Sequence, residues 1–250
     1  MNNKIFVFGC SYATGEELLM HHLGELDSYR IQTAHNPRLF FKKLKQQQNL
    51  KNLYENIKDD QKNIAWPNLL ARKLGYECVN LAESGNSLDK ILYQLFEEQE
   101  KIGKNDITII SLTKPTRNAV FDKTVNSFQL PSLHWPVKSL LGVKDNGDVE
   151  PVINPKTDKA LLDWFTNDRI AWDFIKNLKL LTGTDAKIIP SMTINIDTTF
   201  KLFRNIYEEC AQGFITTKSL DDFSKYRHAW GHPDADAHKK YAEHLYEILR

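Results

Sequence analysis

Phe6-Val7-Phe8-Gly9-Cys10-Ser11-Tyr12-Ala13-Thr14-Gly15-Glu16 joins a short apolar run directly to a serine between two glycines. The bulky apolar residues from Ile5 to Phe8 predict a short buried strand. Gly9 permits a sharp turn, so Ser11 is expected at the carboxyl edge of the sheet, where open α/β sheets form their binding crevices. Backbone N–H groups that begin the next helix can stabilise a developing oxyanion there. Taken alone, however, the serine fits a helix N-cap better than a nucleophile.

The second informative stretch is Gly231-His232-Pro233-Asp234-Ala235-Asp236, near the C-terminus. Apolar residues recur at helical spacing between Tyr241 and Leu249, which predicts a terminal helix that begins at Asp234 or Asp236. His232 immediately precedes this helix, in a loop that Pro233 restricts. A histidine held in this way is suited to act as a general base.

These two stretches together resemble the SGNH/GDSL hydrolase family. Its first block is usually Gly-Asp-Ser and corresponds here to Gly9-Cys10-Ser11, in a form that looks most like the branch found in tailed phages and prophages. Its second block matches the glycine of Asn80–Ser87, which is Gly85, and its last block matches His232-Pro233. The resemblance implies a nucleophile at Ser11, a base at His232, and an oxyanion site made of the backbone N–H groups of Ser11 and Gly85. Without the resemblance, Gly85 is equally well explained as a turn glycine.

Two positions depart from the family pattern. The family's third block has an asparagine after the third strand, but here the chain continues from Thr113 to Asn118 without that block, so Thr113, Arg117 or Asn118 could take its place. The family also places an aspartate three residues before the histidine, and position 229 is alanine. Two hypotheses follow: a Ser-His dyad in which a carbonyl orients the imidazole, or a triad whose acid is Asp221 or Asp222.

The segment from about 114 to 156 is long, rich in turns and aromatic, which is typical of lids and binding surfaces. Trp135 in this segment either stacks on a substrate or packs in a small satellite core. Asn86, beside Gly85, is a candidate substrate contact or the cap of the next helix. Asn86, Thr113, Arg117 and Trp135 are therefore the predicted substrate-binding residues.

Predicted strands alternate with helices along the whole chain. Apolar runs at 5–8, 76–81, 106–112 and 186–192 predict strands, and leucines at helical spacing over 16–26 predict the first helix. This alternation predicts a three-layer α/β/α fold, in which helices cover both faces of a mostly parallel sheet. The resemblance implies the same fold, with a flavodoxin-like sheet. We expect residues 1–250 to form a single domain. Residues 36–63 read as a helical insertion in which seven basic residues outnumber three acidic ones, more consistent with a solvated surface than with a phosphate- or glycan-facing flap.

Composition excludes several classes of function. The 250 residues carry 33 basic and 32 acidic side chains, and a net charge of +1 gives no support to a nucleic-acid or anionic-membrane partner. No apolar run approaches the ~20 residues of a membrane helix, and no export signal is evident, so we expect the protein in the cytoplasm, or in a virion if a phage encodes it. The three cysteines are widely separated, and no Cys/His cluster has zinc-ligand spacing, so we expect no disulfide framework, metal or cofactor. Cys10 is more readily explained as a small packed side chain than as a nucleophile.

Three hypotheses for function follow from these features. The leading one is a serine esterase that hydrolyses a small-molecule or glycan ester, with O-acetylated carbohydrate slightly ahead of lipid. The second is a catalytically degenerate module of the same fold that binds a glycan. The third is a structural or interaction protein of a phage particle.

Overall fold

The structure is a computed structural model of the chain, and its backbone is described for part of the sequence. The described residues are 3–20, 24–33, 37–86, 88–112, 120–122, 127–129, 141–143, 149–151, 187–190, 216, 218–229 and 231–250.

A parallel sheet forms the centre of the described fold. Its strands are β1 (Lys4–Phe8), β2 (Glu77–Asn80), β3 (Ile107–Leu112) and β8 (Lys187–Pro190), in the order β2-β1-β3-β8. Each neighbouring pair is parallel, with Ile5 opposite Cys78 on one side and Ile107 on the other. The first strand therefore lies in the interior of the sheet, as in flavodoxin-like order, and all four strands lie where the sequence predicts them.

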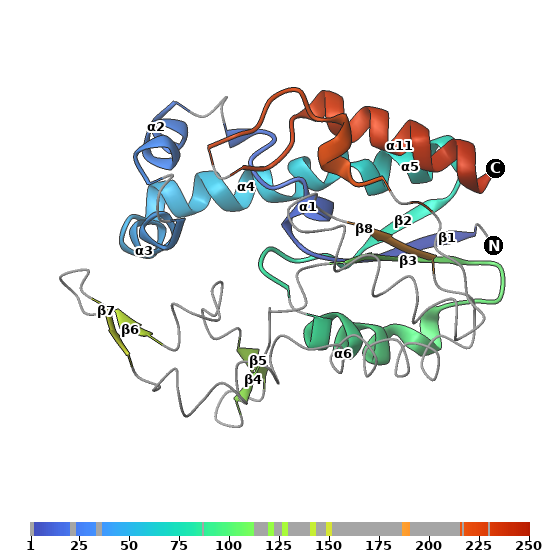
Figure 1. Cartoon of the computed structure of the whole chain (residues 1–250), viewed down its shortest axis with the longest axis horizontal. Coiled ribbons are helices and arrows are strands. Elements are labelled where there is room, and N and C mark those ends of the chain that lie inside the picture. The colour runs from blue at the N-terminus through green and yellow to red at the C-terminus, as the bar shows by residue number, and fades with distance from the viewer. Residues whose placement is uncertain are drawn as a thin grey trace.

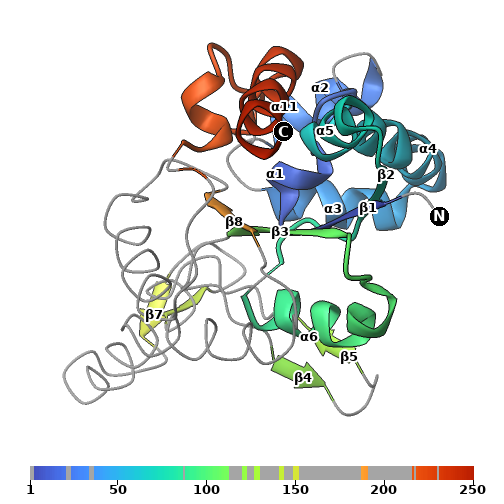
Figure 2. The same cartoon turned by 90° about the vertical axis from the view of Figure 1, so that its right-hand side faces the viewer.

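Helices cover both faces of the sheet. In Figures 1 and 2, α5 (Trp66–Leu74) and α11 (Ala235–Leu249) lie on one face, and α6 (Leu88–Glu98) lies on the other. A short 3-10 turn, η2 (Gln99–Lys101), follows α6, and a second one, η3 (Leu220–Phe223), precedes α11. The predicted α/β/α arrangement is confirmed for the described part of the chain.

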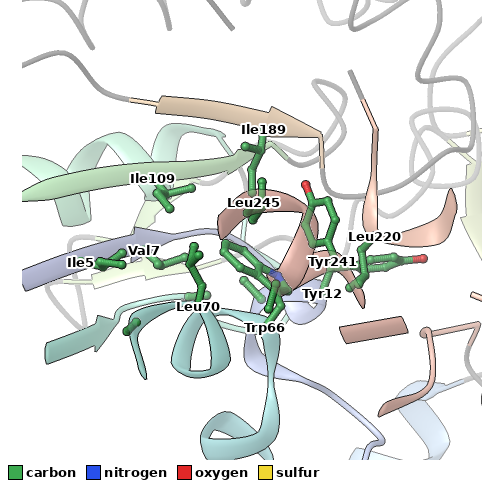
Figure 3. Packing of buried hydrophobic residues seen from close by; sticks show 14 of the residues in the cluster. Ile5, Val7, Tyr12, Trp66, Leu70, Ile109, Ile189, Leu220, Tyr241 and Leu245 are labelled. Atoms are coloured by element: carbon green, nitrogen blue, oxygen red, sulfur yellow. The ribbon is translucent and has the colours of Figure 1, made fainter. Parts of the chain in front are cut away.

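The main core fills the space between the sheet and the pair α5 and α11. Ile5 and Val7 of β1 and Ile109 of β3 point toward Trp66 and Tyr241, and the last two rings meet edge to face at 5.6 Å (Figure 3). Each Å² of apolar surface that is buried in this core stabilises the folded state by about 25 cal/mol. The terminal helix is thus part of the core, and the loop that precedes it is fixed in place.

The chain after β1 differs from the predicted helix over 16–26. A short α1 (Ser11–Thr14) ends at Gly15, whose φ of 72° is left-handed, and residues 15–19 form turns. The next helix, α2, spans Glu25–Gln32. The prediction was wrong because Glu16 and Glu17, which it places in a helix, are both buried and make side-chain hydrogen bonds that turn conformations permit.

Helices α3 (Pro37–Gln46) and α4 (Gln48–Ile64) occupy the basic stretch. Met20, Phe40, Leu44, Leu50 and Tyr54 form a second small core between this pair and the loop after α1. The basic side chains at 42, 45, 51 and 58 are exposed, which fits the solvated surface that the sequence favours. The helix pair is nevertheless tied to the loop after α1 through the contact of Met20 with this core.

Two antiparallel pairs of short strands fall within the predicted lid segment. They are β4 (Val120–Asp122) with β5 (Ser127–Gln129), and β6 (Leu141–Val143) with β7 (Val149–Pro151). The remainder of 114–156 lies outside the described residues, so its role as a lid stays a prediction. Among the described helices, none is long and apolar enough to cross a membrane.

Gly9 is needed at the end of β1 because two strands approach closely there. A Cβ at this position would lie 2.8 Å from the Cβ of Ser111 on β3 and 3.3 Å from that of Ala13. Both neighbours belong to regular elements, so neither can move without shifting backbone. The turn that presents Ser11 therefore depends on the absence of a side chain at position 9.

We expect Gly9→Ala to lower the free energy of unfolding by about 1–3 kcal/mol, as overpacked sites do. Urea denaturation followed by circular dichroism measures this change. Gly103→Ala is the matched control, because its Cβ would meet a carboxylate oxygen of Asp106 at 3.1 Å, in a side chain that can move. Equal losses in the two variants would contradict the steric argument.

His238 joins α11 to the start of α5. Its Nδ1 accepts a hydrogen bond from the backbone N–H of Trp66 at 3.1 Å, and 1% of the residue is exposed. Burial, with smaller contributions from His232 and His228, lowers the pKa of His238 from 6.5 to about 3. The ring is therefore neutral in the folded protein near neutral pH. In the unfolded chain, by contrast, it takes up a proton when the pH falls below its ordinary pKa of 6.5.

This difference makes stability depend on pH. Because the unfolded state binds the additional proton between about pH 6.5 and pH 3, His238 should make the protein less stable as pH falls through that range. From pH 7.5 to pH 5 the expected loss from this residue is about 2 kcal/mol. Urea denaturation of wild type and His238→Gln at both pH values measures it. A pH-dependent loss as large in the variant as in wild type would exclude the buried neutral imidazole as its cause.

Candidate active site

Ser11 and His232 meet at the carboxyl edge of the sheet, although 221 residues separate them in sequence. The Oγ of Ser11 lies 2.8 Å from Nε2 of His232, within the reach of a hydrogen bond. Ser11 is the first residue of α1, directly after the turn at the end of β1, and 6% of it is exposed. The predicted pairing of an N-terminal hydroxyl with a C-terminal imidazole is thus present in the fold.

The loop before α11 holds His232 by its backbone. The N–H of His228 donates to the carbonyl of His232 at 2.9 Å, and Gly231, with a φ of 88°, completes the tight turn between them. At the end of the loop, Asp234 caps α11 by accepting from the N–H of Ala237 at 2.8 Å. The imidazole is therefore anchored to a packed helix on one side and to a closed turn on the other.

Tyr12 supports the imidazole from α1, the helix that carries Ser11. Its ring meets that of His232 edge to face, with centroids 5.3 Å apart, and its hydroxyl donates to the carbonyl of Gly231 at 3.4 Å. Tyr12 is 5% exposed and belongs to the main core. One residue thus packs against the histidine and contacts the loop that carries it.

The carboxylate behind His232 is Glu17. Its Oε2 lies 2.8 Å from Nδ1 of His232, on the opposite side of the ring from Ser11, and the side chain is fully buried. Among the described residues, Glu17 is the one non-glycine residue with a positive φ, 72°. Such a backbone conformation is unfavourable for a residue with a Cβ and is typical of functional positions.

The prediction that Asp221 or Asp222 orients the imidazole was therefore wrong. Asp221 forms an ion pair with Arg227 at 3.2 Å, and Asp222 accepts from the N–H and the hydroxyl of Ser219 at 2.6 and 3.1 Å. Both carboxylates thus stabilise the turn η3 and its neighbouring loop. The dyad hypothesis, in which a carbonyl takes the place of the acid, is also not what the geometry shows.

The hydrogen bonds of Glu17 determine which nitrogen of His232 carries the proton. An ionised carboxylate only accepts hydrogen bonds, so Nδ1 of His232 must donate to it. The lone pair of Nε2 then faces Ser11, whose hydroxyl donates to it. This is the tautomer in which an imidazole can remove the proton of a serine.

Gly85 has the backbone conformation of a tight turn, with a φ of 81°, at the end of the loop after β2. The same loop is tied to the turn before Ser11 because the N–H of Glu83 donates to the carbonyl of Gly9 at 3.2 Å. This link keeps the segment that bears Gly85 beside the turn that bears Ser11.

Asn86 is a structural residue rather than a substrate contact. It is fully buried, and its amide nitrogen donates to the carbonyl of Gly9 at 2.9 Å and to Gln94 at 3.0 Å. A side chain enclosed in this way has no surface for a ligand, so its predicted role in substrate binding is corrected here. Its position instead braces the turn between β1 and Ser11.

The other predicted substrate contacts, Thr113, Arg117 and Trp135, lie outside the described residues. Cys10 is fully buried in the main core, as expected of a small packed side chain. Within the described segments, no group of three or more His, Cys, Asp or Glu side chains is arranged to hold a metal ion.

Sequence reasoning missed Glu17 although it lies close to Ser11 in the chain. The family pattern places the acid three residues before the histidine, where this chain has Ala229 instead of an aspartate. The available signal was the pair Glu16-Glu17 just after Gly15, which directly follows the helix that begins at Ser11. Helical spacing of the leucines obscured it, because it placed both acids on a solvated helix.

The sequence matches no protein-family model and no curated protein. Similar solved structures include one described as a lipolytic protein of the G-D-S-L family, from Desulfitobacterium hafniense, with a TM-score of 0.48 and 11% identity over 99% of this chain and 100% of that one. TesA has a TM-score of 0.48 and 12% identity, over 99% and 98% of the two chains. An acetyl xylan esterase from Butyrivibrio proteoclasticus has a TM-score of 0.49 and 12% identity, over 99% of this chain and 63% of that one.

Glu17 should contribute to stability as well as to the site, because its second oxygen pairs with Arg30 at 2.6 Å in the interior. We expect Glu17→Gln to lower the free energy of unfolding by about 1–3 kcal/mol, the range for hydrogen bonds to charged groups. Glu243→Gln breaks the exposed ion pair with Lys73 and is the matched control, with an expected loss below about 1 kcal/mol. Urea denaturation at neutral pH measures both, and a control loss equal to that of Glu17→Gln would contradict this assignment.

Proposed function

We propose that this protein is a serine ester hydrolase of the SGNH/GDSL type, in which Ser11, His232 and Glu17 form the catalytic triad. The observation that carries the proposal is the continuous chain of contacts from hydroxyl to imidazole to carboxylate, with both hydrogen bonds at 2.8 Å. The sequence blocks around Ser11, Gly85 and His232 support the same assignment.

In the proposed reaction, Ser11 attacks the carbonyl carbon of an ester. His232 Nε2 takes the hydroxyl proton as the new C–O bond forms, and then gives it to the departing alcohol as the ester C–O bond breaks. A water molecule next attacks the acyl carbon and gives a proton to His232; the acyl–Oγ bond then breaks, Ser11 takes this proton from His232, and the carboxylic acid leaves. Glu17 holds the ring in its orientation and stabilises the imidazolium that forms at each step.

The oxyanion of the tetrahedral intermediate needs hydrogen-bond donors that are already in place. The N–H of Ser11 belongs to the first turn of α1, where backbone donors have no acceptor within the helix. The N–H of Gly85 is the second proposed donor, on the loop that is tied to Gly9. A glycine at this position also lets substrate approach the main chain closely.

The substrate we propose is a small-molecule or carbohydrate ester, with O-acetyl groups on carbohydrate as the first class to test. Short acyl groups suit this chain because no strongly apolar acyl-binding stretch stands out in its sequence. The origin in a phage or prophage and the location in the cytoplasm or a virion stay predictions.

Hydrolysis of p-nitrophenyl acetate and labelling by a fluorophosphonate probe test the proposal. We expect wild type to show both, Ser11→Ala to show neither, and Glu17→Gln to lose about a thousandfold or more of kcat, because an amide at this position favours the wrong tautomer of His232. Asp222→Asn, the same change at a carboxylate in the turn η3, should retain activity within about threefold of wild type.

Two results would reject the proposal. A wild-type protein that is folded but neither labelled nor active would favour the glycan-binding or phage structural hypotheses. An activity that falls more in Asp222→Asn than in Glu17→Gln would return the role of the acid to the segment before His232.

A further inference from the structure

Arg30 lies behind the triad, on a helix that the family blocks do not include. Its Nη1 is 2.6 Å from Oε1 of Glu17, the oxygen that does not face His232. Its Nε donates to Asp27 at 2.9 Å, and its Nη2 forms a second hydrogen bond with the same carboxylate. Only 4% of Arg30 is exposed, so this arginine lies in the interior with the acid it contacts.

We infer that Arg30 is a positioning residue that keeps Glu17 ionised and thereby sets the tautomer of His232. This inference rests on the proposed function, because it assigns a role to a residue that acts through the proposed triad acid. A fully buried carboxyl group favours its neutral form, since burial disfavours charge. A guanidinium in direct contact offsets that penalty, and Arg stays protonated throughout the usual pH range.

The consequence for His232 follows from hydrogen-bond chemistry. If Glu17 were protonated, its hydroxyl could donate to Nδ1 of His232, and the ring proton would move to Nε2. Nε2 would then donate toward Ser11 instead of accepting from it, and the base would be lost. The charge of Arg30 opposes this exchange because it stabilises the carboxylate that can only accept.

The other charged and titratable groups around Glu17 do not replace Arg30. From α2, Asp27 is itself bound to the guanidinium. The adjacent Glu16 is engaged by the hydroxyl of Tyr54 on α4 at 2.7 Å, and burial together with Glu16 raises the pKa of that hydroxyl. On the side of α11, His238 is buried, and its pKa is lowered to about 3, so it carries no charge near neutral pH. His228, in the loop before α11, donates through its backbone N–H to the carbonyl of His232 at 2.9 Å.

The insertion at 36–63 contributes to the site indirectly, because it packs against α2, the helix that carries Arg30. Helix α2 packs between the nucleophile loop and α3 and α4, and Tyr29 of α2 packs against Phe40 of α3 at 6.1 Å between ring centroids. The helices that the sequence presents as a basic surface element thus hold the arginine that completes the charge balance of the triad.

Nuclear magnetic resonance of protein labelled with ¹⁵N-histidine tests the inference without requiring turnover. We expect wild type to show the low-field Nδ1–H signal of His232 bonded to a carboxylate at neutral pH. Arg30→Met should lose this signal at neutral pH and regain it toward about pH 9, and Arg30→Lys should retain it. Arg72→Met is the matched control, because this arginine of α5 contacts the main-chain carbonyls of Asn63 and Asn68.

The pH profile of ester hydrolysis is the second measurement. Arg30→Met should reduce kcat/KM by at least about tenfold at pH 7 and approach wild type at higher pH, so that the acid limb of its profile moves upward. A merely structural role would lower activity by the same factor at every pH. If circular dichroism shows that Arg30→Met does not fold, Arg30→Gln, whose amide keeps hydrogen-bond donors without the charge, supplies the test, with a shift in the same direction.

The outcomes separate this inference from the proposed function. An unchanged tautomer and an unchanged acid limb in the folded Arg30→Met variant would overturn the role of Arg30 while leaving the esterase proposal intact. An inert wild type that still shows the Nδ1–H signal, lost on removal of Arg30, would overturn the esterase proposal and support the charge relationship.

Discussion

A single buried carboxylate connects the parts of this molecule. Glu17 contacts His232 through one oxygen and Arg30 through the other, so it ties the loop before α11 to helix α2. A charge without water around it is tolerated only where partners compensate for lost hydration. Because those partners lie on α2 and in the loop before α11, the contacts of Glu17 link these two segments to the turn that follows α1.

The sheet explains why distant residues can meet here. With the first strand inside the order β2-β1-β3-β8, the turn after β1 opens at the middle of the carboxyl edge. α11 packs on the same face as α5, which brings the loop before it over that turn (Figure 1). Gly9 and Asn86 then hold the turn close to β3 and to the loop after β2. Core packing and site geometry are consequently parts of the same arrangement.

The insertion shows how local pattern and tertiary role can diverge. Its exposed lysines mark it as a solvated surface, and the structure agrees on that face. Its opposite face forms a small core with Met20 and carries, through α2, the arginine beside Glu17. The charge pattern of a helix pair predicts which face is exposed to solvent. It gives no information about the contacts that the buried face makes.

The sequence by itself determined the parallel α/β fold, the strands, the terminal helix and the pairing of Ser11 with His232. The fold, the strands and the terminal helix follow from local periodicity and from the rule that parallel strands end at one edge of a sheet, whereas the pairing of Ser11 with His232 was implied by the resemblance to the SGNH/GDSL family. Only the tertiary structure decided that Glu17, rather than Asp221 or Asp222, completes the group and that Asn86 is enclosed. A carboxylate or amide looks the same in sequence whether water or protein surrounds it, and that difference arises only when packing removes the water.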